Sequence, residues 1–309
     1  MKYFCKLFPV FLSVFMVLTA CASKPVPEKP SSGKISIIAT LFPQYDFARQ
    51  IAGEYAEVTL LLPPGAESHS FEPSPNDMIR ISQSRLFLYT GDAMEPWVPK
   101  MLAGFEDPGF LAADLSQGIS LEPEEAHGDH TEHAGFDPHI WTSPVKAKQM
   151  VKNITDALCQ IDPQHKSEYE KNSSAYMEQL DQLDAKFRDI AQNGKRRDFV
   201  FGSRFACRYF AEEYGLQPLS PYDSCSAETE PSAQAMAHII DYIQSAGIPV
   251  IYYQELTDEK TARSIAEATG ADLLLFHSCH NVSKEDFQNG VTYLSLMEQN
   301  AGHLQKGLA

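Results

Sequence analysis

A short stretch between residues 127 and 144 concentrates side chains that bind metal ions. Its first half carries three His at a spacing of three, among acidic and small residues: His127, His130 and His133. Neutral imidazoles are common ligands for borderline metal ions, and His-rich tracts are typical of metal binding. This half has no apolar face to bury, so residues 124–134 are expected to form a mobile loop that collects metal ions. The alternative is a polar, solvated linker.

The second half of the stretch is compact and apolar-flanked, and it reads Asp137-Pro138-His139-Ile140-Trp141. A second His, His69, lies in a loop that holds four Pro and one Gly between residues 63 and 77. Spacing alone favours a structural role for His139. Two Pro-stiffened loops could nevertheless hold two imidazoles in place for one ion. Glu72 and Asp137 are close enough in sequence to orient these rings as hydrogen-bond acceptors, or alternatively they cap the loops.

The elements that must position these residues alternate between strands and helices. Strands are predicted at 35–40, 57–62 and 86–90, with helices starting at Pro43, Pro75 and Glu95. Such alternation predicts a mostly parallel sheet. A helical segment without a strand signal spans 144–194, and the alternation resumes at 198. The predicted fold class is α/β, with two Rossmann-like lobes, 34–143 and 195–309, joined by a long rigid backbone helix.

The first residues are typical of an export signal. Two Lys flank the start of an apolar run, which ends in Leu18-Thr19-Ala20-Cys21. This pattern predicts a signal peptide at 1–20, and its ending looks like a bacterial lipobox, in which Cys21 is lipidated. The alternative is an ordinary signal with an incidental Cys. Residues 21–33 are Pro-rich and predict an extended tether, so the protein is expected outside the cytoplasm, anchored to the cell membrane.

Composition limits the partners. The 309 residues are 43% hydrophobic, enough for two globular lobes, and the net charge of -16 argues against nucleic acid as a partner. A monomer is expected. Besides Cys21, four Cys remain beyond the export signal in a compartment where disulfides persist: Cys159, Cys207, Cys225 and Cys279.

Two motifs together carry a resemblance to a known family. The segment Gly65-(x)3-His69-Ser-Phe-Glu72-Pro-Ser-Pro-x-Asp77 and the segment Asp137-Pro-His139-Ile-Trp resemble the motifs of the cluster A-I solute-binding lipoproteins, which supply zinc or manganese to ABC importers. The resemblance covers essentially the whole chain after Cys21. It implies a metal site in the cleft between the lobes, with His69 and His139 as ligands. It also implies an ABC permease and its ATPase as partners.

The chain departs from the family pattern at the other ligand positions. Arg204 stands where the third family ligand is a His, and a guanidinium offers no lone pair. His277 stands where the fourth ligand is usually a carboxylate. We therefore expect a rearranged site of His69, His139 and His277, completed by water, His280 or Glu228. Arg204 is then expected to pair with an acid, for which the candidates are Glu228, Glu230 and Glu255.

Cys225 and Cys279 are expected at one rim of the second lobe. A disulfide between them would tie down the loop that carries His277. The competing interpretation is ligation of the metal by the Cys279 thiolate.

The function expected from these features is high-affinity zinc binding outside the cytoplasm and delivery of the ion to an ABC importer, without enzymatic activity. Zinc is favoured over manganese because imidazoles suit a borderline ion, and the His-rich loop resembles insertions in zinc-binding members of the family. A manganese receptor of the same family is the first alternative. A secreted zinc hydrolase is the second, with Glu72 or Glu228 as the base, but the chain has no His-Glu-x-x-His motif.

Overall fold

The computed structural model describes residues 33–106, 108–123, 135–222 and 230–309. Its first sheet has the order β2-β1-β3-β4, and all its strands are parallel. The strands are β1 (Ile35–Ala39), β2 (Ala56–Leu60), β3 (Leu86–Tyr89) and β4 (Leu111–Asp114), and the connecting segments hold α1 (Phe42–Ala52), η1 (Gly53–Tyr55), α2 (Pro75–Gln83) and α3 (Val98–Ala103). Parallel strands require such crossovers, which place helices on the faces of the sheet.

This sheet is buried on both faces. Alternate residues of β1 point into different cores, because successive side chains of a strand face opposite sides. Ile37 packs in the large core that α1, α4 and α5 share. Ile38 packs with Phe87 and Ile81 in a second core under α2 and α3. The β3 segment Leu86–Tyr89 is buried throughout, as expected for an inner parallel strand.

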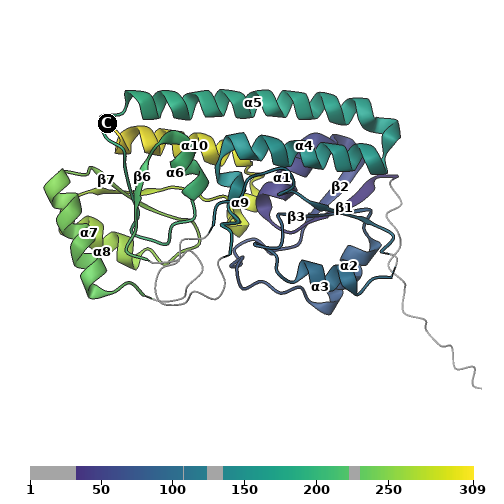
Figure 1. The fold of residues 1–309 in the computed structure, drawn as a ribbon, viewed down its shortest axis with the longest axis horizontal. Helices are drawn as coiled ribbons and strands as arrows, with labels where there is room; N and C mark the ends of the chain where they lie inside the picture. Colours follow the sequence, from purple (N-terminus) through teal and green to yellow (C-terminus); the bar gives the residue numbers. More distant parts are fainter. Residues whose placement is uncertain (1–32, 107, 124–134, 223–229) are drawn as a thin grey trace, which may run out of the picture. The chain divides into compact units, whose positions relative to one another are not determined.

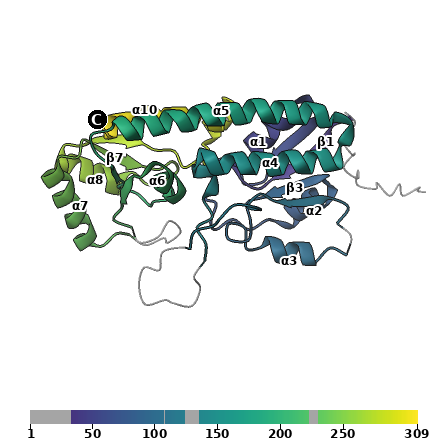
Figure 2. The same cartoon turned by 45° about the horizontal axis from the view of Figure 1, so that its top comes forward.

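Two long helices follow the first sheet (Figures 1 and 2). The first, α4, spans Pro144–Ile161 and begins where the Ser143 side chain accepts a hydrogen bond from the backbone N–H of Lys146. Helix α4 ends at Asp162-Pro163, and the next long helix, α5, spans Lys166–Asn193. The 28 residues of α5 extend over about 42 Å, and α5 packs against α1, α4 and α10. This confirms the predicted long helical connection.

The remaining strands form two parallel pairs, β5 with β6 and β7 with β8. A bridge between Phe201 and Tyr252 links the pairs. Gly202 lies directly beyond this bridge, and a side chain there would meet Ala262 at 2.4 Å, so only glycine fits. The elements are β5 (Asp198–Val200), α6 (Arg208–Tyr214), β6 (Gln217–Leu219), α7 (Ala233–Ala246), β7 (Val250–Tyr253), α8 (Lys260–Thr269), β8 (Asp272–Leu275), α9 (Lys284–Gln288) and α10 (Tyr293–Gly307).

The α/β class with parallel sheets is confirmed. The predicted lobe boundaries at 143 and 195 stay predictions, because Gly33–Ala309 group as one compact unit. Among the described helices, none combines the length and the apolar character needed to cross a membrane. The signal peptide, Cys21, the His-rich loop, Cys225 and Glu228 lie outside the described residues.

Candidate metal centre

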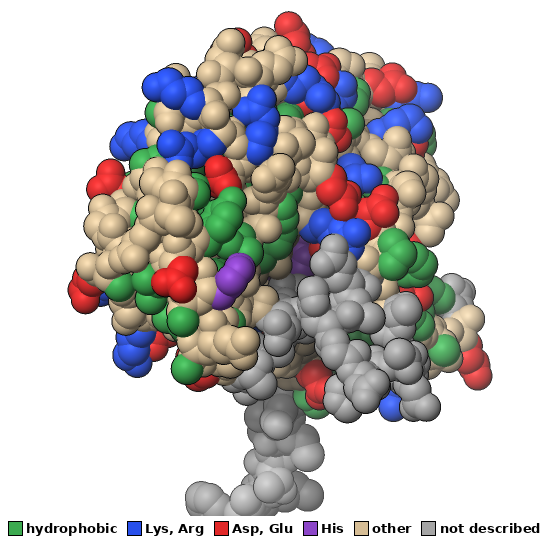
Figure 3. Space-filling view, turned by 60° about the vertical axis from the view of Figure 1, so that its left-hand side comes forward, with side chains coloured by type: hydrophobic (Ala, Val, Ile, Leu, Met, Phe, Trp, Pro, Cys, Tyr) green, Lys and Arg blue, Asp and Glu red, His purple; other side chains and the backbone are tan. Residues whose placement is uncertain are grey.

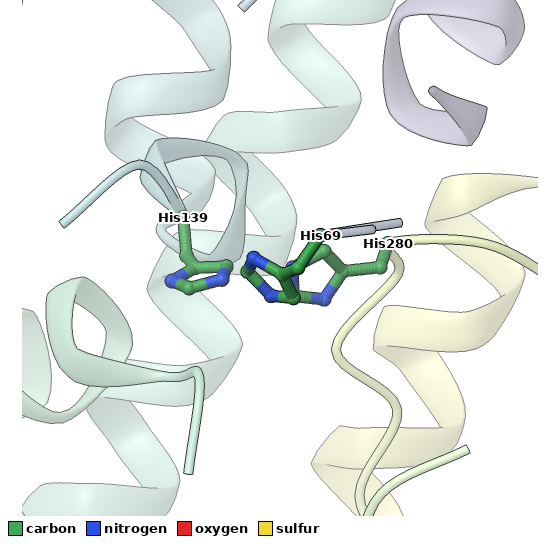
Figure 4. A group of neighbouring side chains, drawn as sticks. All are labelled: His69, His139 and His280. Atoms are coloured by element: carbon green, nitrogen blue, oxygen red, sulfur yellow. The ribbon is translucent and has the colours of Figure 1, made fainter. Parts of the chain in front are cut away.

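Three imidazoles from distant parts of the chain converge at one point (Figure 4). They belong to His69, His139 and His280, and one nitrogen from each lies within 4.8 Å of the others. The ring centroids are 5.4 Å apart for His69 and His139, 5.2 Å for His69 and His280, and 4.4 Å for His139 and His280. This is the group of potential ligands found among the described His, Cys, Asp and Glu residues. The predicted pair of His69 and His139 is part of it, and the third member is His280.

His69 lies in the loop between β2 and α2. The end of this loop is fixed at Ser74, which caps α2 in a reciprocal arrangement with Asp77. The Glu67 carboxylate fixes the middle of this loop, because it accepts hydrogen bonds from the backbone N–H groups of His69 at 2.9 Å and Ser70 at 2.7 Å. Sequence reasoning named Glu72 for this role. Glu72 is exposed, and the acceptor that holds the loop is Glu67.

His139 directly precedes η2 (Ile140–Thr142) and is fully buried. Its Nδ1 lies 2.7 Å from Oδ1 of Asp137, which also accepts from the His139 backbone N–H at 2.9 Å. Burial alone would raise the pKa of Asp137, but the charge and hydrogen bonds of His139 lower it. An ionised Asp137 accepts the Nδ1 proton and leaves the Nε2 lone pair for a metal. This is the orienting role expected for Asp137.

His280 is oriented by a relay through a hydroxyl group. Its Nδ1 lies 2.7 Å from Oγ of Ser278, and that hydroxyl donates to Oε1 of Glu255 at 2.6 Å. The Ser278 backbone N–H donates to the other Glu255 oxygen at 2.7 Å. The hydroxyl therefore accepts from Nδ1, and the lone pair of His280 is on Nε2. This Nε2 is buried and has no hydrogen-bond partner among the described residues, which suits a ligand atom.

The two loops that carry His69 and His280 are bound to each other. The Asn281 amide donates to the carbonyl oxygens of Pro63 at 2.8 Å and Ala66 at 2.9 Å. The Gly65 N–H donates to the carbonyl of Val282 at 2.8 Å. Gly65 has a φ of +84°, a conformation that glycine adopts without strain. These bonds join segments more than 200 residues apart in the sequence and fix the positions of the two His-bearing loops relative to each other.

Burial favours the neutral form of two of the three imidazoles, His69 and His280. Desolvation is the main cause that lowers the pKa of His69 from 6.5 to about 4, and the neighbouring His139 lowers it further. Desolvation also lowers the pKa of His280 well below its usual value, with His139 and His69 adding to the effect. Since a neutral imidazole is the form that ligates a metal, His69 and His280 can bind at neutral pH without first releasing protons.

A pH dependence follows from the lowered pKa of His69. The unfolded chain binds a proton at about pH 6.5, whereas the folded protein resists protonation down to about pH 4. The unfolded state therefore holds more protons in this window, and stability rises with pH there. We expect the metal-free protein to lose stability as the pH falls from 6.5 towards 4, measured by urea unfolding. His69→Gln should flatten this dependence, and an unchanged pH profile in that variant would contradict the assignment.

The structure does not place His277 in the cluster. Its backbone N–H donates to Oδ1 of Asn300 at 2.7 Å, and its Nδ1 accepts from the Cys279 N–H at 2.9 Å. A neutral imidazole has a single lone pair, and here Cys279 occupies it. The chain then turns at Cys279, which has a φ of +61°. The third imidazole of the cluster is therefore that of His280, which sequence reasoning named only as a candidate fourth ligand.

Other predicted residues lie around the cluster. Arg204 lines a cleft that His69 and His280 also line. Its charge contributes to lowering the pKa of His69. It forms no ion pair with the described candidates Glu230 and Glu255 within the described part of the chain. Cys279 is a buried free thiol. Its predicted disulfide partner, Cys225, lies outside the described residues, so the disulfide stays a prediction. Burial raises the pKa of the Cys279 thiol, so its thiolate is not a favoured ligand.

Comparison with known proteins identifies the family of the chain. A family model described as zinc-uptake complex component A, periplasmic, matches residues 37–307. The high-affinity zinc uptake system protein ZnuA of Bacillus subtilis is 33% identical over 97% of this chain and 96% of its own length. The zinc-binding lipoprotein AdcA of Streptococcus pneumoniae is also 33% identical, but the match spans only 58% of its length.

Solved structures of metal-binding proteins share the fold of this chain. The metal-dependent lipoprotein YcdH of Bacillus subtilis superposes with a TM-score of 0.77 at 33% identity, over 89% of this chain and 99% of that one. The Zn(II)-bound ZnuA-like domain of Streptococcus pneumoniae AdcA superposes with a TM-score of 0.76 at 31% identity, over 89% and 99% of the two chains. The chain belongs to the periplasmic zinc-uptake component A family, within the metal-binding class that its two His motifs resemble.

Proposed function

We propose that this protein is an extracytoplasmic zinc receptor that binds the ion between His69, His139 and His280 and delivers it to an ABC importer. The observation that carries the proposal is the convergence of these three imidazole nitrogens within 4.8 Å. Its support from relatives is that those named for zinc uptake or zinc binding match nearly the whole chain. Binding is then the function, and the protein needs no chemical step.

The donor set favours zinc over manganese. Three imidazole nitrogens suit Zn²⁺, whereas Mn²⁺ prefers oxygen ligands. Three carboxylates bonded around the cluster, Asp137, Glu255 and Glu67, are engaged by His139, by Ser278 and by the backbone at His69 and Ser70. They therefore tune the imidazoles instead of offering an oxygen-rich site.

The remaining parts of the proposal concern location and partners. Cys21 is the proposed lipid anchor, which would hold the receptor at the outer side of the cell membrane beside an ABC permease and its ATPase. The lobes would be 34–143 and 195–309, with residues 144–194 between them. The receptor would act as a monomer. Labelling with a fatty-acid probe, lost in Cys21→Ser, tests the anchor.

A zinc hydrolase is the competing function, since three protein ligands leave a coordination position open. A hydrolase needs a base beside the bound water. Of the two candidate bases, Glu72 is exposed and Glu228 lies outside the described residues. The described carboxylate beside the cluster, Glu255, is bound to Ser278 on both oxygens. These observations favour the receptor.

Titration with zinc in the presence of a competing chromophoric chelator tests the proposed function. We expect one tight site per chain that survives dilution, and no turnover of ester, amide or phosphoester substrates by the zinc-loaded protein. Zinc-dependent turnover would support the hydrolase, and the absence of any stoichiometric site would overturn both functions.

The His-rich loop is proposed to bind further zinc ions weakly. Deleting residues 124–134 removes His127, His130 and His133 but none of the three converging imidazoles. We expect the number of bound zinc ions to fall while the affinity of the tight site is kept. The measurement is calorimetric titration of both proteins. Loss of the tight site in the deletion protein would show that the loop supplies an essential ligand.

A further inference from the structure

Two of the three imidazoles, those of His69 and His280, border a cleft of about 310 Å³. His69 and His280 lie in its wall, together with the loop 65–68 and the segment 254–258. Arg204 also lines the cleft. On the face shown in Figure 3, a recessed His side chain is visible next to a basic one. A metal ion held by the cluster would therefore face a space that is large enough for a small organic molecule.

The cluster supplies neutral ligands only. Three imidazoles leave the fourth position of a tetrahedral zinc ion open and add no negative charge to the ion's coordination sphere. A bound divalent cation is the largest local charge in such a site. An anion at the open position would complete the coordination and offset part of this charge.

Arg204 adds a second positive charge on the same side. Its side chain lines the same cleft as His69 and His280. It follows β5, and the Ser203 hydroxyl donates to its carbonyl oxygen at 3.1 Å. A guanidinium binds carboxylates in a planar, bidentate geometry. The position at which a His is expected from the family motif is thus occupied by a residue that can hold an anion but not a metal.

Three of the four acidic residues that line the cleft have other partners, and the fourth, Glu230, is exposed and forms no ion pair with Arg204 among the described residues. Glu255 accepts from Ser278, and Glu67 accepts from the backbone at His69 and Ser70. Asp258 lies 2.7 Å from the ammonium group of Lys260. These pairings leave the positive charge of Arg204 available to a ligand that enters the cleft.

We propose that the zinc ion is bound together with a small carboxylate anion, which occupies the open coordination position and is held by Arg204. This inference rests on the proposed function, because the anion has no site without the metal. Linkage requires that the anion and the ion raise each other's affinity by the same factor. The receptor would therefore respond to the concentration of small carboxylates as well as to zinc.

Acetate is the probe that tests this proposal. Zinc affinity is measured by chelator competition in a sulfonate buffer, with acetate or methanesulfonate added at equal ionic strength and free zinc determined in each sample. We expect acetate to lower the zinc Kd about tenfold, as one charge-assisted bidentate contact would. With Co²⁺ in place of zinc, acetate should change the visible absorption of the bound ion. Both responses should disappear in Arg204→Gln and partly return in Arg204→Lys.

Arg263→Gln is the matched control, because Arg263 is an exposed guanidinium paired with Glu259 on α8. It should respond to acetate as the unaltered protein does. Tight zinc binding without any acetate response, or an equal response in Arg204→Gln, would overturn the anion site but leave the receptor function intact. A response that appears only in Glu228→Gln would also overturn it, since the chain's own carboxylate would then fill the position. Absence of stoichiometric zinc binding in every buffer would instead refute the function.

Discussion

Replacing His280 by Asn is expected to weaken zinc binding at least about 100-fold, because one of three ligands is lost from a centre whose total binding free energy is shared among few bonds. The same replacement at His277 should leave zinc affinity within about threefold. The Oδ1 of an Asn at position 277 can still accept the hydrogen bond from the Cys279 N–H, which His277 Nδ1 accepts at 2.9 Å. Calorimetric or competition titration of the two variants measures the difference.

This pair of variants is matched, since both residues lie in the same loop and both receive the same side chain. Far-ultraviolet circular dichroism and urea unfolding show whether each variant keeps its fold. Equal losses of affinity would indicate that the loop as a whole, and not His280, determines binding. A selective loss in His277→Asn would restore the ligand set expected from the sequence.

Replacing Asp137 by Ala is expected to weaken zinc binding about 10–100-fold, although Asp137 is not proposed to touch the ion. Its carboxylate lies 2.7 Å from Nδ1 of His139 and fixes the proton there. Without it, His139 can adopt the other tautomer or rotate, and its Nε2 is no longer directed at the ion. Asp137→Asn keeps an acceptor but loses the charge, so we expect an intermediate affinity. The zinc Kd of both variants tests this order.

Asp114→Ala serves as the control for this experiment. Asp114 also accepts hydrogen bonds locally, from the backbone and hydroxyl of Ser116, but it is not part of the cluster. Its loss should reduce stability without changing the zinc Kd. If Asp114→Ala and Asp137→Ala weakened binding equally, the effect would be one of general stability, and the orienting role of Asp137 would be wrong.

Much of the fold could be predicted from the sequence because local signals agree with it. The helical segment predicted to start at 144 begins there, at Pro144. Two short strands were missed, Leu111–Asp114 and Gln217–Leu219. Neither has a strong alternating or β-branched pattern. Pairing with the buried strands β3 and β5 defines them, and such tertiary pairing leaves little trace in a short sequence window.

The site was predictable only in part, and for a similar reason. His69 and His139 lie in motifs with stiffening Pro residues, so the sequence identifies them. The choice between His277 and His280 depends on a left-handed turn at Cys279. A Cys does not predict this backbone conformation, which is uncommon for residues other than glycine. The orienting groups Glu67 and Ser278 were missed as well. Their roles depend on hydrogen bonds within folded loops, and a Glu or Ser in such a loop is common without any such role.

The central claim is that one ion is held by His69, His139 and His280. A crystal of the zinc-loaded protein, with anomalous differences recorded on both sides of the zinc absorption edge, tests it most directly. We expect a single strong peak at about 2.0–2.1 Å from one nitrogen of each of these residues, with His277 still bonded to the Cys279 N–H. A peak bonded to His277, or one held only by the His-rich loop, would contradict the account.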